Sequence, residues 1–137
     1  MTENSISELT QKIKSMGPWH HDIHLFDDFT TGKVFSPDGK LDRSDNDGVS
    51  LISPRGRYLR QLDEIYPEGM AGKSFLDCAC NGGGYCFWTR ERGLERGVGF
   101  DVRQHWIQQA KLVQQYRTVF PTDRLEFEVM DLYDVAK

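Results

Sequence analysis

Apolar residues recur every three or four positions in two early stretches of the chain, which is the spacing of one face of a helix. The first stretch covers residues 5–16, where Ser5 followed by Glu8 has the pattern of a capping box. The second follows Pro54 and carries an apolar stripe made of Tyr58, Leu59, Leu62, Ile65 and Tyr66. Between them, residues 36–48 (SPDGKLDRSDNDG) are rich in turn-forming residues and predict a surface loop.

The pattern changes in the second half of the chain. Residues 74–80 (SFLDCAC) form a nearly continuous apolar run, which predicts a strand buried on both faces. Residues 97–101 predict a second strand, and residues 124–130 alternate apolar and charged side chains, as a strand near a sheet edge does. Helices are expected between the strands, the second over residues 104–118. The order β-α-β-α-β predicts an α/β fold with a parallel sheet and right-handed crossovers.

Composition fits one globular domain. The 137 residues are 38% apolar and 28% charged, with a net charge of −4 that argues against a strong nonspecific grip on nucleic acid. The sequence has no apolar run long enough to cross a membrane and no signal-peptide core, and its three cysteines fit reduced thiols, so we expect a cytoplasmic protein. We expect an N-terminal extension over residues 1–55 and a sheet domain over residues 56–137.

The most informative stretch is FLDCACNGGGY, residues 75–85. Small residues after a strand let a ligand approach the backbone, and the next helix offers free N–H groups. Asp101 ends the second strand about 18 residues after Gly83, near the offset of an acid that accepts both ribose hydroxyls. Asp131 and Leu132 follow the third strand, where an acid can meet an adenine amino group. These strand ends predict one nucleoside-binding crevice.

The identity of the ligand depends on Asp77 and Phe87. A dinucleotide fingerprint would need a third glycine where Phe87 stands, and Asp77, inside the strand before the loop, would repel a pyrophosphate. A carboxylate there suits a cation or an amine. S-adenosylmethionine carries both a sulfonium and an α-amino group and has no phosphate, so it is the favoured ligand.

This stretch resembles the first motif of the class I S-adenosylmethionine-dependent methyltransferases, which is an apolar strand, an acid and a loop of small residues. Asp77 matches the acid, and three residues stand where the commonest version has glycines: Ala79, Asn81 and Gly83. The resemblance implies a Rossmann-like sheet and S-adenosyl-L-methionine as cofactor. It implies a cofactor site made of Asp77, Ala79, Asn81, Gly82, Gly83, Asp101, Val102, Asp131 and Leu132.

A narrower resemblance covers most of the chain. Residues 19–25 (WHHDIHL), Thr31 with Gly32, and residues 72–77 (GKSFLD) are similar to the group related to the tRNA wobble-uridine methyltransferases of the 5-oxyacetate pathway. His21 matches the histidine of that group, which makes it the candidate catalytic base. The resemblance raises tRNA as the methyl acceptor, whereas the acidic net charge favours a small molecule.

The sequence also offers four other candidate sites. His20, His21, Asp22 and His24 could hold a metal, but the sequence has no second cluster to complete the ligands. Cys78, Cys80 and Cys86 are expected to be buried in the core rather than to bind a metal. Residues 72–74 mimic a phosphate loop and residues 42–48 a calcium loop, but neither has the required spacing.

The length of the chain limits how much of the fold it can contain. The resemblance implies a seven-stranded sheet with the first strand near its centre, and this sequence reaches only the third strand. We therefore expect a truncated sheet whose first strand lies at an edge, and pairing of that edge with a second copy or a complementary chain. Alternatively, residues 19–35 cover the edge. A non-catalytic S-adenosylmethionine-binding or assembly module, and an enzyme that degrades S-adenosylmethionine, remain alternatives to a methyltransferase.

Overall fold

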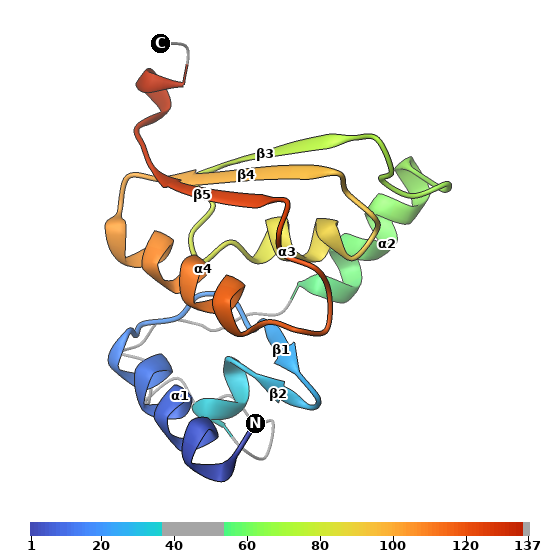
Figure 1. Ribbon diagram of the computed structural model, residues 1–137. Coiled ribbons are helices and arrows are strands. Elements are labelled where there is room, and N and C mark those ends of the chain that lie inside the picture. Colours follow the sequence, from blue (N-terminus) through green and yellow to red (C-terminus); the bar gives the residue numbers. More distant parts are fainter. Residues whose placement is uncertain (37–53, 136–137) are drawn as a thin grey trace.

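The computed structural model describes residues 1–36 and 54–135 of the protein (Figure 1). The loop predicted over residues 36–48 lies outside these residues except for Ser36. None of the helices in the described ranges has the length and apolar character needed to cross a membrane.

Three parallel strands form the sheet, in the order β3-β4-β5. They are β3 (Ser74–Cys78), β4 (Arg96–Asp101) and β5 (Leu125–Val129). The crossover helices are α3 (Gly84–Arg90) and α4 (Gln104–Tyr116). This confirms the predicted β-α-β-α-β order and the parallel, Rossmann-like α/β sheet. The register brings the carboxyl ends of all three strands to one edge of the sheet.

The segment before the sheet packs on the helices. It contains α1 (Glu3–Ser15), the antiparallel pair β1 (His24–Phe26) and β2 (Phe29–Thr30), and a 3-10 helix, η1 (Gly32–Val34). In Figure 1 these elements lie below α4, on the side of the helices away from the sheet. Helix α2 (Arg55–Ile65) then leads to β3.

Helix α1 begins earlier than the sequence pattern predicts. The cap is Thr2, whose Oγ1 accepts a hydrogen bond from the Ser5 backbone N–H at 3.2 Å. The predicted capping box at Ser5 is therefore wrong, because an equivalent hydroxyl three residues upstream already satisfies that N–H. The apolar face is as predicted, with Leu9 and Ile13 fully buried.

The core fills the space between the sheet, the helices and the N-terminal segment. Its largest fully buried side chains come from both halves of the chain and include Trp19, Ile23, Phe87 and Trp88. The Trp19 indole N–H donates to the Ile13 carbonyl at 2.7 Å, which ties the chain after α1 to that helix. Burial of these large aromatic surfaces in one cluster holds the segment against the sheet domain.

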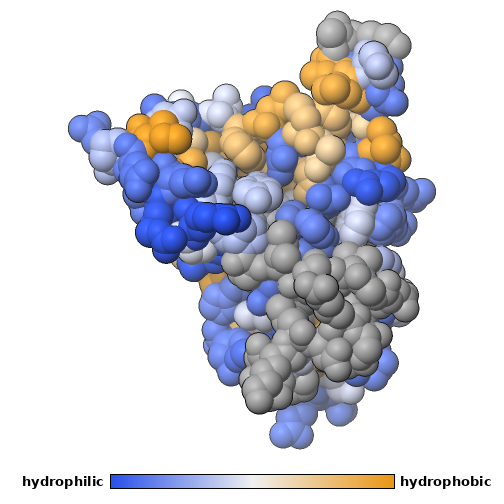
Figure 2. Space-filling view, turned by 180° about the vertical axis from the view of Figure 1, so that it is seen from behind, coloured by the Kyte–Doolittle hydropathy of each residue, from blue (hydrophilic) through white to orange (hydrophobic). Residues whose placement is uncertain are grey.

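Strand β3 is not buried on both faces, contrary to the prediction. Ser74, Leu76 and Cys78 are exposed, and Leu76 exposes 51% of its surface. Helices α1 to α4 of Figure 1 lie on one side of the sheet, so the described residues leave most of the other face open. Seen from behind, apolar residues run across the upper part of the molecule, where the sheet lies (Figure 2). The N-terminal segment packs on the helices and, in the described part of the chain, leaves the β3 edge uncovered.

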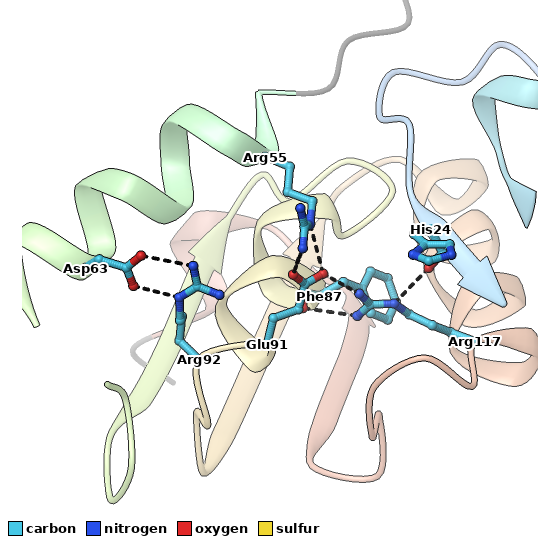
Figure 3. A network of polar contacts seen from close by, with 7 residues as sticks. All are labelled: His24, Arg55, Asp63, Phe87, Glu91, Arg92 and Arg117. Atoms are coloured by element: carbon cyan, nitrogen blue, oxygen red, sulfur yellow. Dashed lines mark hydrogen bonds and ion pairs between the residues drawn. The ribbon is translucent and has the colours of Figure 1, made fainter. Parts of the chain in front are cut away.

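A buried ion pair joins the elements on the helix side (Figure 3). Arg117, just after α4, donates to the Glu91 carboxylate at 2.6 Å, and both side chains are almost completely buried. Arg55 of α2 donates to the same carboxylate from the surface. Arg117 also donates to the carbonyls of His24 and Phe87, so one guanidinium contacts β1, α3 and the end of α4.

Candidate functional site

A cavity of about 290 Å³ lies at the carboxyl ends of the three strands. Its lining residues are Cys78, Ala79, Phe100, Asp101, Val102, Arg103, Met130, Asp131 and Leu132. The structure therefore brings together five of the residues predicted from the sequence, namely Ala79, Asp101, Val102, Asp131 and Leu132. The position is the crevice outside the strand ends where open α/β sheets bind ligands.

The loop after β3 has an alternating left-handed backbone. The φ angles are 61° at Ala79, 49° at Asn81 and 79° at Gly83. These are the three positions that the methyltransferase motif commonly fills with glycine. An alanine pays about 1–2 kcal/mol for this conformation, whereas asparagine tolerates it better. The loop thus keeps a glycine-type geometry at two positions without a glycine.

The last two glycines of the loop are required by close packing. A Cβ at Gly83 would lie 2.6 Å from the Phe127 ring, and one at Gly84 would lie 2.7 Å from the His21 ring. Gly82 is also buried, beside the Gln109 side chain of α4. The loop is therefore clamped between β5, α4 and the N-terminal segment, so its conformation is fixed by the core.

His21 is buried behind this loop, with 2% of its surface exposed. Its Nδ1 accepts a hydrogen bond from the Gly84 backbone N–H at 3.3 Å, and its ring packs edge-on against Tyr85 and Trp88. Burial lowers the pKa of His21 to about 4, so the ring is neutral at pH 7. Because Nδ1 is already an acceptor, this geometry supports a role in positioning the loop. A role as base stays a hypothesis.

Asp77 lies at the end of β3 but outside the lining of the cavity. It is half-buried on the side of α3, where the Cys86 thiol donates to it at 3.9 Å. Burial raises the pKa of Asp77 to about 6, and the Asp101 charge acts in the same direction. Because the pKa of Asp77 is raised, a bound cation nearby would stabilise the charged form of the carboxylate.

The Asp101 carboxylate, which is 1% exposed, is held by four hydrogen bonds. Oδ1 accepts from the Arg103 backbone N–H at 3.0 Å and from Arg103 Nε at 2.9 Å. Oδ2 accepts from the Asn81 backbone N–H at 3.2 Å and from Arg103 Nη2 at 3.0 Å. Burial acts to raise the pKa of Asp101, but the Arg103 and Asn81 bonds hold it below its ordinary value.

Arg103 is the site residue that the sequence interpretation missed. Its Nη2 also donates to Asn81 Oδ1 at 3.0 Å, and its guanidinium lies 5.4 Å from the Trp106 ring centroid. A basic residue two positions after a strand-ending acid was the available signal. The spacing alone does not show that both side chains turn toward each other.

Exposed groups form the outer wall of the cavity. Val102 and Leu132 expose 59% and 62% of their surfaces. Asp131 caps the short 3-10 helix η3 (Leu132–Asp134), where its Oδ1 accepts from the Tyr133 N–H at 3.0 Å. Apolar side chains can cover a flat ring, and an acid between them can accept a hydrogen bond from the amino group of that ring. Among residues 1–36 and 54–135, no group of three histidine, cysteine or acidic side chains is placed to hold a metal.

No family model and no curated protein sequence matches the chain. The solved structure of EvdMO1 matches 94% of the chain with a TM-score of 0.59 and 14% identity. The N-terminal domain of EvdMO1 with SAH bound matches 98% of the chain, with a TM-score of 0.57 and 15% identity.

A protein of Listeria monocytogenes assigned as an S-adenosylmethionine dependent methyltransferase matches 58% of the chain, with a TM-score of 0.44 and 21% identity. The chain spans 25% of EvdMO1, 49% of its N-terminal domain and 34% of the Listeria protein. The two EvdMO1 matches establish the Rossmann-like α/β fold over nearly the whole chain.

Proposed function

We propose that the chain binds S-adenosylmethionine, or its product S-adenosylhomocysteine, at the carboxyl ends of β3, β4 and β5. The observation that carries this proposal is the placement of a glycine-type loop and a buried acid, Asp101, at consecutive strand ends around one cavity. The fold match to a domain that was solved with SAH bound supports the same ligand.

Each part of this ligand has a candidate partner. Asp101 would accept from the ribose hydroxyls, and Val102 and Leu132 would cover the adenine ring. Asp131 would accept from the adenine amino group. Asp77, on the α3 side of the loop, would pair with the ammonium group at the amino acid end of the ligand. These residues bind and orient the ligand, and none of them needs to transfer a proton.

The proposed activity is methyl transfer, with this chain as the cofactor-binding part. Bound in this site, S-adenosylmethionine would supply an electrophilic methyl group, and positioning it in line with an acceptor is the main requirement. For the methyl acceptor we propose two classes, tRNA and a small molecule. Similarity to the wobble-uridine group favours tRNA, whereas a net charge of −4 favours a small molecule.

The test is calorimetric titration with S-adenosylmethionine and S-adenosylhomocysteine. Asp101→Ala should weaken binding by about 1.5–3 kcal/mol, the usual loss for hydrogen bonds to a charged group. Asp123→Ala is the matched control, because Asp123 is an exposed acid before β5, at the opposite end of the strands. Equal affinity of the wild type and Asp101→Ala would remove Asp101 from the site.

A turnover assay then separates three activities. A methylated acceptor supports the methyltransferase. Binding without any product indicates a non-catalytic binding or assembly module, and a product derived from the cofactor alone indicates an S-adenosylmethionine-degrading enzyme. We expect no efficient methylation by the 137-residue chain alone, because the sheet in the described residues offers no fourth strand end for an acceptor site.

We also propose that the β3 edge pairs with a second copy of the chain or with a complementary chain. Among the described strands β3 pairs with β4 alone, so its other edge has backbone groups free to pair. The exposed Leu76 side chain adds an apolar surface beside that edge.

A further inference from the structure

The hydrogen-bonding capacity of the Asp101 carboxylate is fully used in this structure. Each carboxylate oxygen offers about two lone-pair positions to donors. Oδ1 and Oδ2 each accept from one backbone N–H and from one nitrogen of the Arg103 guanidinium. No position is left for a hydroxyl of a ligand while all four bonds persist.

The four donors differ in how easily they can leave. The backbone N–H groups of Asn81 and Arg103 are fixed by the chain at the loop and at the start of α4. The guanidinium is on a side chain that is 51% exposed, so it can rotate into water. Its departure would free one position on each oxygen, while the two backbone donors continue to hold the carboxylate in place.

We propose that the Arg103 guanidinium occupies the position of a ribose diol and must leave when a ligand binds. This inference rests on the proposed function, because it assumes a ligand with neighbouring hydroxyls. A ribose presents two adjacent O–H donors, which can replace Nε on Oδ1 and Nη2 on Oδ2. A deoxyribose presents one, so its binding leaves one oxygen without the partner it had. Arg103 therefore lowers the affinity of the site, whereas the preference for a complete diol comes from the two oxygens of Asp101.

Groups beside the carboxylate can hold the guanidinium near the site. In this structure Trp106 of α4 lies 5.4 Å from the guanidinium, within cation–π distance, and the Asn81 amide oxygen accepts from it at 3.0 Å. The bonds that are given up join a half-exposed guanidinium to a buried carboxylate. Water can replace them on the guanidinium, and the ligand hydroxyls replace them on the carboxylate. The competition therefore lowers the affinity without abolishing binding.

The test compares the wild type with Arg103→Met by calorimetry, with S-adenosylhomocysteine as the probe. Methionine keeps much of the side-chain length and has no donor, so we expect the dissociation constant to fall by about five- to tenfold. Arg124→Met is the control, because Arg124 is an exposed arginine before β5, and it should leave the constant unchanged. If the wild type binds S-adenosylhomocysteine and Arg103→Met binds it equally or more weakly, the proposed competition is wrong, but the proposed function stands. No binding by either protein would overturn the proposed function as well.

Thermal unfolding separates competition from a purely structural role. Without ligand, Arg103→Met should unfold at a lower temperature than the wild type, because Asp101 loses two donors. With saturating S-adenosylhomocysteine the difference should close, since the wild type has then lost the same bonds. A difference that persists in the presence of ligand would overturn the proposal. Arg103→Lys is a milder variant, because it keeps the charge but cannot bond both oxygens in parallel. Its dissociation constant and its unfolding temperature without ligand should lie between those of the wild type and Arg103→Met.

Discussion

At the scale of single residues, the loop after β3 holds an alanine in a conformation that favours glycine. Ala79 has a φ of 61° and lies at the wall of the candidate cavity. Its methyl group contributes to the apolar lining, while its backbone carries the cost of the left-handed region. The side chain of Ala79 adds apolar surface to the cavity, but its backbone conformation lowers the stability of the fold.

Ala79→Gly should raise the free energy of unfolding by about 0.5–1 kcal/mol, because relief of the left-handed conformation exceeds the added flexibility of the unfolded chain. Ala110→Gly in α4 is the matched control, and it should lower stability by about 1 kcal/mol or more, since Ala110 is buried inside a helix. Urea unfolding followed by circular dichroism measures both changes. A decrease in stability for Ala79→Gly would contradict the assignment of strain.

Asp77 should couple ligand binding to proton release. Its pKa is raised to about 6 mainly by burial, so below pH 6 the free protein keeps it protonated. A ligand with an ammonium group favours the charged form, which lowers that pKa and expels the proton. Affinity for S-adenosylmethionine should therefore rise as the pH increases from about 5 to 7.

The measurement is calorimetry at pH 6 in two buffers of different ionisation enthalpy. Asp77→Asn should abolish the buffer dependence, and adenosine, which has no ammonium group, should show none with the wild type. His21 does not contribute to this window, because its own pKa is lowered to about 4. Equal proton release by the wild type and Asp77→Asn would assign the proton to another group.

At the scale of secondary-structure elements, the buried pair of Glu91 and Arg117 replaces apolar packing where α3, the end of α4 and β1 meet. Removing one partner leaves the other charge buried without compensation. The exposed pair of Asp63 and Arg92, also drawn in Figure 3, joins α2 to the residues after α3 and lies in water. The two pairs offer a direct comparison of the same chemistry at different burial.

Glu91→Gln should lower the free energy of unfolding by about 3–5 kcal/mol, because the Arg117 guanidinium then lacks a buried counter-charge. Asp63→Asn should cost less than about 1 kcal/mol, since its partner is hydrated. Denaturant unfolding of the two variants gives both values. Similar losses in the two variants would show that burial of the Glu91 pair has little energetic weight.

The sequence predicts these elements unevenly. The strand order and Asp101 at its strand end follow from apolar runs and from spacing, because both are local patterns. The two-sided burial of β3 was wrong, since an apolar run looks the same whether one or both faces of a strand are covered. The contact of His21 with Gly84 spans 63 residues, and the turn of Arg103 toward Asp101 depends on side-chain geometry. Neither leaves a periodic signal.

At the scale of the whole molecule, helices α1 to α4 lie on one side of the sheet, and the described part of the chain leaves most of the other side open (Figures 1 and 2). The open side carries Leu76 of β3 and Val98 of β4 in register, with the Arg96–Glu126 ion pair beside them. An apolar strip at an unpaired edge is a surface on which a further strand or helix can pack.

Light scattering at micromolar concentration should give a mass above the 15.8 kDa of one chain. Leu76→Glu should shift the protein toward the monomer, because it places a charge in the contact. Ile65→Glu, at an exposed apolar position on α2, should leave the mass unchanged. A sharp mass near 15.8 kDa for the wild type, together with cooperative unfolding, would exclude pairing at this edge.

The contact between Arg117 and β1 also has a consequence for how the chain is made. The His24 carbonyl receives its hydrogen bond from a residue 93 positions later, and the Gln109 amide reaches back to Met16 over the same separation. During synthesis the N-terminal segment therefore emerges from the ribosome well before its partners exist. Contacts of such long range slow folding, because closing the long loop between the two residues costs conformational entropy before the contact can stabilise the chain. Ile23 and Leu25 lack the core neighbours that later elements contribute in that interval, so we expect chaperones that hold exposed apolar segments to bind the nascent chain.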